Sequence, residues 1–166
     1  DASIDNALTA VFLHSGQVCS AGARLLVEKS IHDKFVNEVA RRADLIRLGS
    51  PEDSFAETGA LISAAHREKV EKYVANAISE GAKLIAGGKR PTESHLQNGF
   101  YYRPTVLDNC HSQMQCVQDE SFGPVLTGEQ VATTPKSFAI VIERRQWKGS
   151  VTIITSFIFF NFINFT

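Results

Sequence analysis

The sequence predicts an α/β domain in which helices flank an open, mostly parallel sheet. Segments with helical apolar spacing alternate with short β-type segments over the first 127 residues, which is the pattern of such a sheet. The 166 residues suit about one domain, and 43% hydrophobic with 21% charged residues is an ordinary composition for a soluble α/β protein with a core. The elements are expected in the following order.

The first helix is expected over residues 4–13, with Ser3 as its N-cap. Its buried stripe would consist of three apolar residues: Leu8, Val11 and Phe12. A loop of small residues then covers positions 16–22, and residues 24–28 form a short strand.

The second helix opens at residues 30–33, where Asp33 stands near the capping-box position, and ends at residues 48–51. Its apolar residues at helical spacing are Ile31, Phe35, Val39 and Leu45. Ser63 caps a third helix that reaches about Ser79, and Gly81 stops it. The apolar face of this helix consists of Val70, Tyr73, Val74, Ala77 and Ile78.

Two further strands are expected over residues 82–86 and 101–107, joined by a glycine turn and a polar loop. Pro104 places the second of these strands at a sheet edge or at a bulge, because proline cannot donate to the ladder. Residues 117–126 follow and contain the segment Glu120-Ser-Phe122-Gly123-Pro124.

Residues 128–166 differ in kind and are expected to form an irregular tail. Periodicity is lost from Gly128 on, and the uncharged run 151–166 holds five of the eleven phenylalanines. This run is shorter than the ~20 residues of a spanning helix, so a foreign or out-of-frame tail is favoured over a membrane anchor. We expect the tail to pack poorly and to aggregate.

The net charge bears on binding of nucleic acid, and the number of cysteines bears on disulfides, metal binding and the cellular compartment. A formal net charge of −1 offers no basic field for nucleic acid. The three cysteines, an odd number, fit neither a disulfide framework nor a metal site. No signal peptide leads the chain, so reduced thiols in the cytoplasm are expected, with no metal.

Cys19 is the strongest candidate for chemistry. It lies among Gly16, Ala21 and Gly22, and such small neighbours let a carbonyl substrate approach a thiolate. An isolated cysteine is more often a small buried hydrophobe, which is the interpretation we give to Cys110 and Cys116. We expect Arg24 to be an ion-pairing structural residue rather than an anion site, and we do not assign His14 as a base.

The motif Phe12-x-x-x-Gly16-Gln17-x-Cys19-x-Ala21-Gly22 resembles the cysteine signature of the NAD(P)-dependent aldehyde dehydrogenase superfamily. The second signature of that family is similar to residues 120–125, about 100 residues later. The resemblance covers residues 1–127, which would be part of the catalytic domain, whereas 128–166 would lie outside the family. Within the family, residues 14–22 and 65–67 look most like those of betaine-aldehyde dehydrogenases.

The resemblance implies an oxidoreductase that converts an aldehyde, such as betaine aldehyde, to the acid with NAD(P)+. Cys19 would be the nucleophile, forming a thiohemiacetal and then a thioester. Glu120 would bind the nicotinamide ribose hydroxyls, and Phe122 would orient the nicotinamide ring. NAD is favoured over NADP, and the family forms homodimers or homotetramers.

The resemblance also implies that the main dinucleotide-binding domain and the general-base glutamate precede residue 1, so we expect the isolated chain to be inactive. Three alternatives stay open beside the enzyme. The chain would be a non-catalytic remnant that associates with intact subunits through its sheet edge, a membrane-tethered module using residues 151–166, or a thiol-dependent hydrolase.

Overall fold

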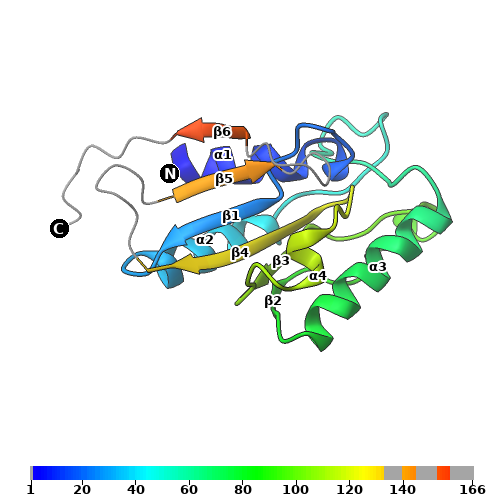
Figure 1. Ribbon diagram of the computed structural model, residues 1–166. Helices are drawn as coiled ribbons and strands as arrows, with labels where there is room; N and C mark the ends of the chain where they lie inside the picture. Colours follow the sequence, from blue (N-terminus) through cyan, green and yellow to red (C-terminus); the bar gives the residue numbers. More distant parts are fainter. Residues whose placement is uncertain (1, 133–139, 145–152, 158–166) are drawn as a thin grey trace.

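The computed structural model describes residues 2–132, 140–144 and 153–157 (Figure 1). In this part of the chain a six-stranded sheet has the order β2-β3-β4-β1-β5-β6. The strands are β1 (Arg24–Glu28), β2 (Lys83–Ala86), β3 (Thr105–Asp108), β4 (Val125–Val131), β5 (Ile140–Arg144) and β6 (Ile153–Phe157). The helices are α1 (Ala2–Phe12), α2 (His32–Ala43), α3 (Ala64–Ser79) and the one-turn α4 (Gln115–Gln118), with 3-10 turns η1 (Leu13–Gly16) and η2 (Ser94–Leu96).

The centre of the sheet is parallel. β3 pairs parallel with β4, and β4 pairs parallel with β1, whereas β2 and β5 run against their neighbours on either side. β6 pairs antiparallel with β5 and therefore points the same way as β1 (Figure 1). The predicted α/β class with an open, mostly parallel sheet flanked by helices is confirmed.

Alternation along β3 and β4 divides the core between the two faces of the sheet. Val106 and Leu126 lie opposite one another and belong to the cluster that α1 and α2 cover. Leu107 and Val125, one position along each strand, belong to a second cluster that α3 covers. Successive side chains of a strand point to opposite faces, so one strand pair supplies both clusters.

The third helix has the predicted boundaries. Ser63 is its N-cap, and its Oγ accepts a hydrogen bond from the backbone N–H of His66 at 3.1 Å. Gly81 follows the helix with φ of +107°, a conformation that glycine adopts without the steric cost of a Cβ. Val70, Val74 and Ala77 are buried as predicted, whereas Ile78 is exposed.

The predicted caps and ends of the first two helices were wrong in detail. α1 begins at Ala2, so Ser3 lies buried inside the helix instead of capping it. α2 ends at Ala43. The next residues form a turn that is closed by a hydrogen bond from Ile46 N to Ala43 O. Leu45 is therefore off the helical stripe and 64% exposed.

Pro104 does not mark an edge. It immediately precedes Thr105, the first residue of β3, and β3 is an interior strand between β2 and β4. The irregularity in this pair lies on β2, where the register shifts between Leu84 and Ala86. Proline is tolerated here because Pro104 lies outside the ladder, to which it could donate no N–H.

The segment after Thr127 is described only in part. β4 continues to Val131, four residues past the expected end of the family region at 127, and β5 and β6 extend the sheet beyond β1. Most of the expected irregular tail, including five of its six phenylalanines, lies outside the described residues. Within the described part, no helix has the length and apolar character needed to cross a bilayer.

The core should respond strongly to truncation of Leu107, which is fully buried between β3 and α3. Leu107→Ala removes packing that the strand cannot recover, so we expect the free energy of unfolding to fall by about 3 kcal/mol. Urea denaturation of both proteins measures the change. Leu45→Ala, at an exposed position, serves as the control and should change stability by less than about 0.5 kcal/mol. Similar effects of the two substitutions would contradict this assignment of the core.

The Glu71 carboxylate on α3 should make stability depend on pH. It accepts two hydrogen bonds from Arg90, at 2.6 and 2.8 Å, which hold its pKa below its ordinary value of 4.5. A lowered carboxyl pKa stabilises the fold above the ordinary value, and this contribution disappears as the pH falls through the lowered pKa. Glu71→Gln should cost up to about 1 kcal/mol near neutral pH and progressively less below pH 4.5.

Urea titrations of Glu71→Gln across this pH range provide the measurement. Glu52→Gln is the matched control, because within the described residues the exposed Glu52 carboxylate has no ion-pair partner. A loss of stability in Glu71→Gln that stays constant down to acidic pH would show that the ion pair with Arg90 is not its source.

Candidate active site

The loop that carries Cys19 begins with three consecutive residues in left-handed conformations. His14, Ser15 and Gly16 have φ values of 50°, 57° and 71°. Non-glycine residues adopt this region at a cost, so the surrounding structure must hold His14 and Ser15 there. After the reversal the chain passes α1 again, where the Gly22 N–H donates to Ala10 O at 2.8 Å, and then enters β1.

Hydrogen bonds to residues 58–62 hold this reversal in place. The Ser15 N–H donates to Thr58 Oγ1 at 2.9 Å, the Ser15 hydroxyl donates to Gly59 O at 2.6 Å, and Thr58 Oγ1 donates to Phe12 O at 3.1 Å. Gln17 adds a contact outside the turn, because its Oε1 accepts from the backbone N–H of Ile62 at 2.9 Å. These hydrogen bonds fix the turn, and Cys19, which follows it, is exposed.

The second loop, residues 119–124, precedes β4. Phe122 also has a positive φ of 51°, and its carbonyl accepts a hydrogen bond from His66 Nε2 at 2.7 Å. The buried Ser121 hydroxyl accepts from the Gly123 N–H at 3.3 Å, which tightens the turn. Glu120 is exposed, and among the described residues its carboxylate has no hydrogen-bond partner.

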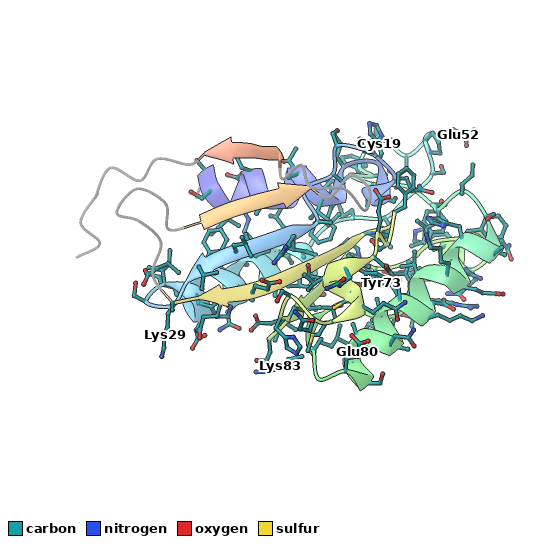
Figure 2. All side chains as sticks on the ribbon, in the orientation of Figure 1. Cys19, Lys29, Glu52, Tyr73, Glu80 and Lys83 are labelled. Carbon is teal, nitrogen blue, oxygen red and sulfur yellow. The ribbon has the colours of Figure 1, made fainter. Side chains whose placement is uncertain are left out.

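The two loops touch through their glycines. A Cβ built on Gly16 would lie 2.1 Å from the carbonyl oxygen of Gly123, so no side chain fits there. Both loops lead into parallel neighbours, β1 and β4, and so meet at the end of the sheet where these strands begin (Figure 2). The close approach brings the two sequence motifs into one site although they are about 100 residues apart.

Two of the three predicted site residues line a small recess between these loops. Glu120 and the half-buried Phe122 line a cavity of about 40 Å³ together with Gly16, Ala21 and Arg24. Cys19 does not line this recess, and its thiol lies in the exposed part of the first loop, beside it in sequence. Glu120 and Phe122 therefore line one recess. Cys19 lies outside it, on the loop whose Gly16 lines the same recess.

Arg24 has the structural role that the sequence predicts. Its guanidinium donates two hydrogen bonds to the Glu129 carboxylate, at 3.1 and 2.8 Å, across the parallel strands β1 and β4. Both side chains are largely buried, so the pair supports the floor of the site.

Cys110 and Cys116 are buried in the cluster beneath α3, in agreement with the structural role predicted for them. A hydrogen bond between the two thiols raises the pKa of Cys110, and burial raises it further. The same hydrogen bond lowers the pKa of Cys116. Their burial separates them from the exposed thiol of Cys19.

Sequence reasoning missed the residues that support the two loops. Thr58, Gln17 and His66 act through hydrogen bonds to backbone groups far away in the chain, and such partners leave no local pattern. Two signals were available: Gln17 belongs to the cysteine motif and His66 to the segment Ala65-His66-Arg67 of the resemblance, but neither residue had an assigned role.

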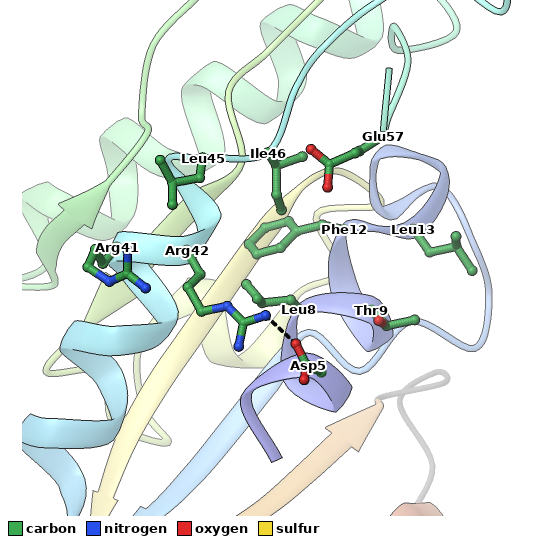
Figure 3. A pocket seen from close by; sticks show the side chains of 10 residues that line it. All are labelled: Asp5, Leu8, Thr9, Phe12, Leu13, Arg41, Arg42, Leu45, Ile46 and Glu57. Carbon is green, nitrogen blue, oxygen red and sulfur yellow. Dashed lines mark hydrogen bonds and ion pairs between the residues drawn. The ribbon is translucent and has the colours of Figure 1, made fainter. Parts of the chain in front are cut away.

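A larger cavity touches the cysteine motif only at its first residues, Phe12 and Leu13. Its volume is about 420 Å³, and it opens between α1 and the C-terminal end of α2, where Arg42 pairs with Asp5 (Figure 3). Cys19, Glu120 and Phe122 do not line it. Its position gives it no part in the site formed by the two loops.

Comparison with known proteins agrees with the two motifs. The model of the aldehyde dehydrogenase family matches residues 1–143. Betaine aldehyde dehydrogenase of Bacillus subtilis is 59% identical over 129 residues, which are 78% of this chain and 26% of that protein. 4-Trimethylaminobutyraldehyde dehydrogenase B of Danio rerio is 44% identical over 127 residues, 75% of this chain and 24% of that protein.

A solved structure shares the fold. The crystal structure of betaine aldehyde dehydrogenase from Staphylococcus aureus in complex with NAD+ superposes with a TM-score of 0.77 at 46% identity, covering 79% of this chain and 26% of that one. The chain thus spans about a quarter of the length of the relatives that it matches. With a family match over most of its length and both motifs assembled at one end of its sheet, the chain belongs to the aldehyde dehydrogenase family.

Proposed function

We propose that this chain supplies the thiol-bearing half of an active site that oxidises an aldehyde to a carboxylic acid with NAD+. The observation that carries the proposal is the contact between Gly16 and Gly123, which joins the Cys19 loop to the loop of Glu120 and Phe122. The proposed nucleophile and a carboxylate suited to bind a ribose thereby lie at the same end of the sheet, where β1 and β4 begin. Family membership supports the reaction class.

Cys19 is the nucleophile in this proposal. Its thiolate attacks the aldehyde carbon, the carbonyl π electrons move to the oxygen, and protonation of that oxygen gives a thiohemiacetal. The carbon then loses a hydride and the hydroxyl group loses its proton, which leaves a thioester on Cys19. Water cleaves the C–S bond of this thioester to give the acid and the Cys19 thiol. The exposure of Cys19 supports this role, since an incoming aldehyde can reach the sulfur.

Glu120 and Phe122 would hold the nicotinamide half of NAD+, the group that accepts the hydride when bound. A carboxylate without a protein partner, like that of Glu120 among the described residues, can accept both hydrogen bonds of a ribose diol. The half-buried aromatic ring of Phe122 offers an apolar surface for the flat nicotinamide. The solved relative in complex with NAD+ supports NAD as the coenzyme.

The proposed substrates are aldehydes that carry a trimethylammonium group, of which betaine aldehyde is the first to test. Two relatives are named for such aldehydes, betaine aldehyde and 4-trimethylaminobutyraldehyde. The division of the chain near residue 127, a cytoplasmic location, a homodimeric or homotetrameric state and the inactivity of the isolated chain stay predictions. The tests below therefore measure partial steps instead of turnover.

Betaine aldehyde should protect Cys19 from alkylation, because a thiohemiacetal removes the free thiolate. We expect iodoacetamide to label Cys19 well before the buried Cys110 and Cys116, and betaine aldehyde to slow this labelling. Peptide mass spectrometry after timed quenching measures the rate at each cysteine. Betaine, the corresponding acid without an electrophilic carbonyl, is the matched control. Equal rates with aldehyde and acid would exclude thiohemiacetal formation at Cys19.

Glu120→Gln should weaken binding of reduced nicotinamide mononucleotide by about tenfold, because a charged acceptor of two hydrogen bonds is lost. Titration of the nucleotide's fluorescence measures the affinity. Glu52→Gln makes the same change in charge at an exposed position outside both loops and should leave the affinity within about twofold. Equal losses in both variants would assign the effect to net charge and remove Glu120 from the ribose site.

A further inference from the structure

Side chains on one side of α3 form hydrogen bonds with the main chain of the loop that holds Glu120 and Phe122. Three side chains at helical spacing reach it: His66, Lys69 and Tyr73. Lys69 Nζ donates to Glu120 O at 3.5 Å, and Tyr73 Oη donates to Asp119 O at 3.4 Å and to the carbonyl of Cys116. The shape of the loop thus depends on a helix that carries neither sequence motif.

His66 makes the closest of these contacts to a proposed site residue. Its Nε2 lies 2.7 Å from the carbonyl oxygen of Phe122, and because a carbonyl can only accept, Nε2 carries the hydrogen. The two rings also meet edge to face, with centroids 6.4 Å apart and an interplanar angle of 66°. His66 therefore contacts both the main chain and the side chain of Phe122.

Phe122 needs such support because of its backbone conformation. Its φ of 51° lies in the left-handed region, which phenylalanine adopts only when its surroundings impose it. The next residue is also confined, since a Cβ on Gly123 would lie 2.6 Å from Cγ2 of Val70, one turn after His66 on α3. The loop cannot move away from the helix without losing both contacts.

We infer that His66 is a positioning residue that sets the conformation of Phe122 and, through it, the surface offered to the nicotinamide ring. The inference rests on the function proposed for Phe122 only in its last step. The ring orientation itself is a property of the folded chain and can be measured without coenzyme.

The test compares one substitution that lacks a hydrogen-bond donor with one that keeps a donor. His66→Leu removes the donor, whereas His66→Gln keeps an amide N–H at a similar reach. His95→Leu, at an exposed histidine on η2, is the matched control. Nuclear magnetic resonance reports the ring signals of Phe122 and the hydrogen exchange of the Gly123 amide, which donates to Ser121 Oγ.

We expect His66→Leu to shift the Phe122 ring signals and to speed exchange at Gly123 by about tenfold, the effect of one lost hydrogen bond. His66→Gln should restore the exchange rate to within about twofold, and His95→Leu should change nothing. Should the leucine variant fail to fold, His66→Asn replaces it, because its short amide keeps polarity without reaching the carbonyl. Unchanged signals in the leucine or asparagine variant, or failure of glutamine to rescue, would overturn the inference.

A coenzyme measurement separates this result from the proposed function. Reduced nicotinamide mononucleotide should bind His66→Leu about tenfold more weakly than the unaltered chain and bind His66→Gln almost normally. If the unaltered chain binds no nucleotide, the role proposed for Phe122 fails while the resonance result still decides the position of its ring. If nucleotide affinity is the same in all variants although the ring has moved, the link from His66 to the coenzyme is refuted.

Discussion

The site depends on the close approach of two backbones, at Gly16 and Gly123. With a projected Cβ only 2.1 Å from the opposing carbonyl, the first loop can reach the second only through a residue without a side chain. Everything proposed for this chain follows from that approach, because Cys19 lies on one side of it and Glu120 on the other. The parallel pairing of β1 with β4 continues the same contact into the sheet, where Arg24 and Glu129 join the strands.

Both loops are strained where they meet, and each is held by hydrogen bonds from a different part of the chain. The first has three left-handed residues and is secured by Thr58, and the second has Phe122 in a left-handed conformation and is secured by His66. Such conformations persist only where surrounding contacts impose them, and they concentrate at functional sites. The hydrogen bonds from Thr58 and His66 thereby stabilise the strained conformations of the two loops.

The sequence allowed the class of fold and the identity of the two motifs to be predicted, because both are written in local patterns. Ser63 and Gly81 marked the ends of α3, and the small residues around Cys19 marked an accessible thiol. The positions of Ser3, Leu45 and Pro104 were misjudged, since helix ends and strand order are decided by tertiary contacts that a single sequence does not display. The support from Thr58 and His66 was out of reach for the same reason, as each acts on residues more than forty positions away.

The Arg24–Glu129 pair joins residues that are 105 positions apart in the sequence. During synthesis Arg24 is therefore made long before its partner. The ribosome releases the cysteine loop long before it makes the strand that completes the site. Long-range parallel pairing forms slowly, because a large chain entropy is lost before any contact rewards it. A nascent chain therefore passes through a period in which the thiol of Cys19 is already outside the ribosome but the second loop of the candidate site has not yet been made.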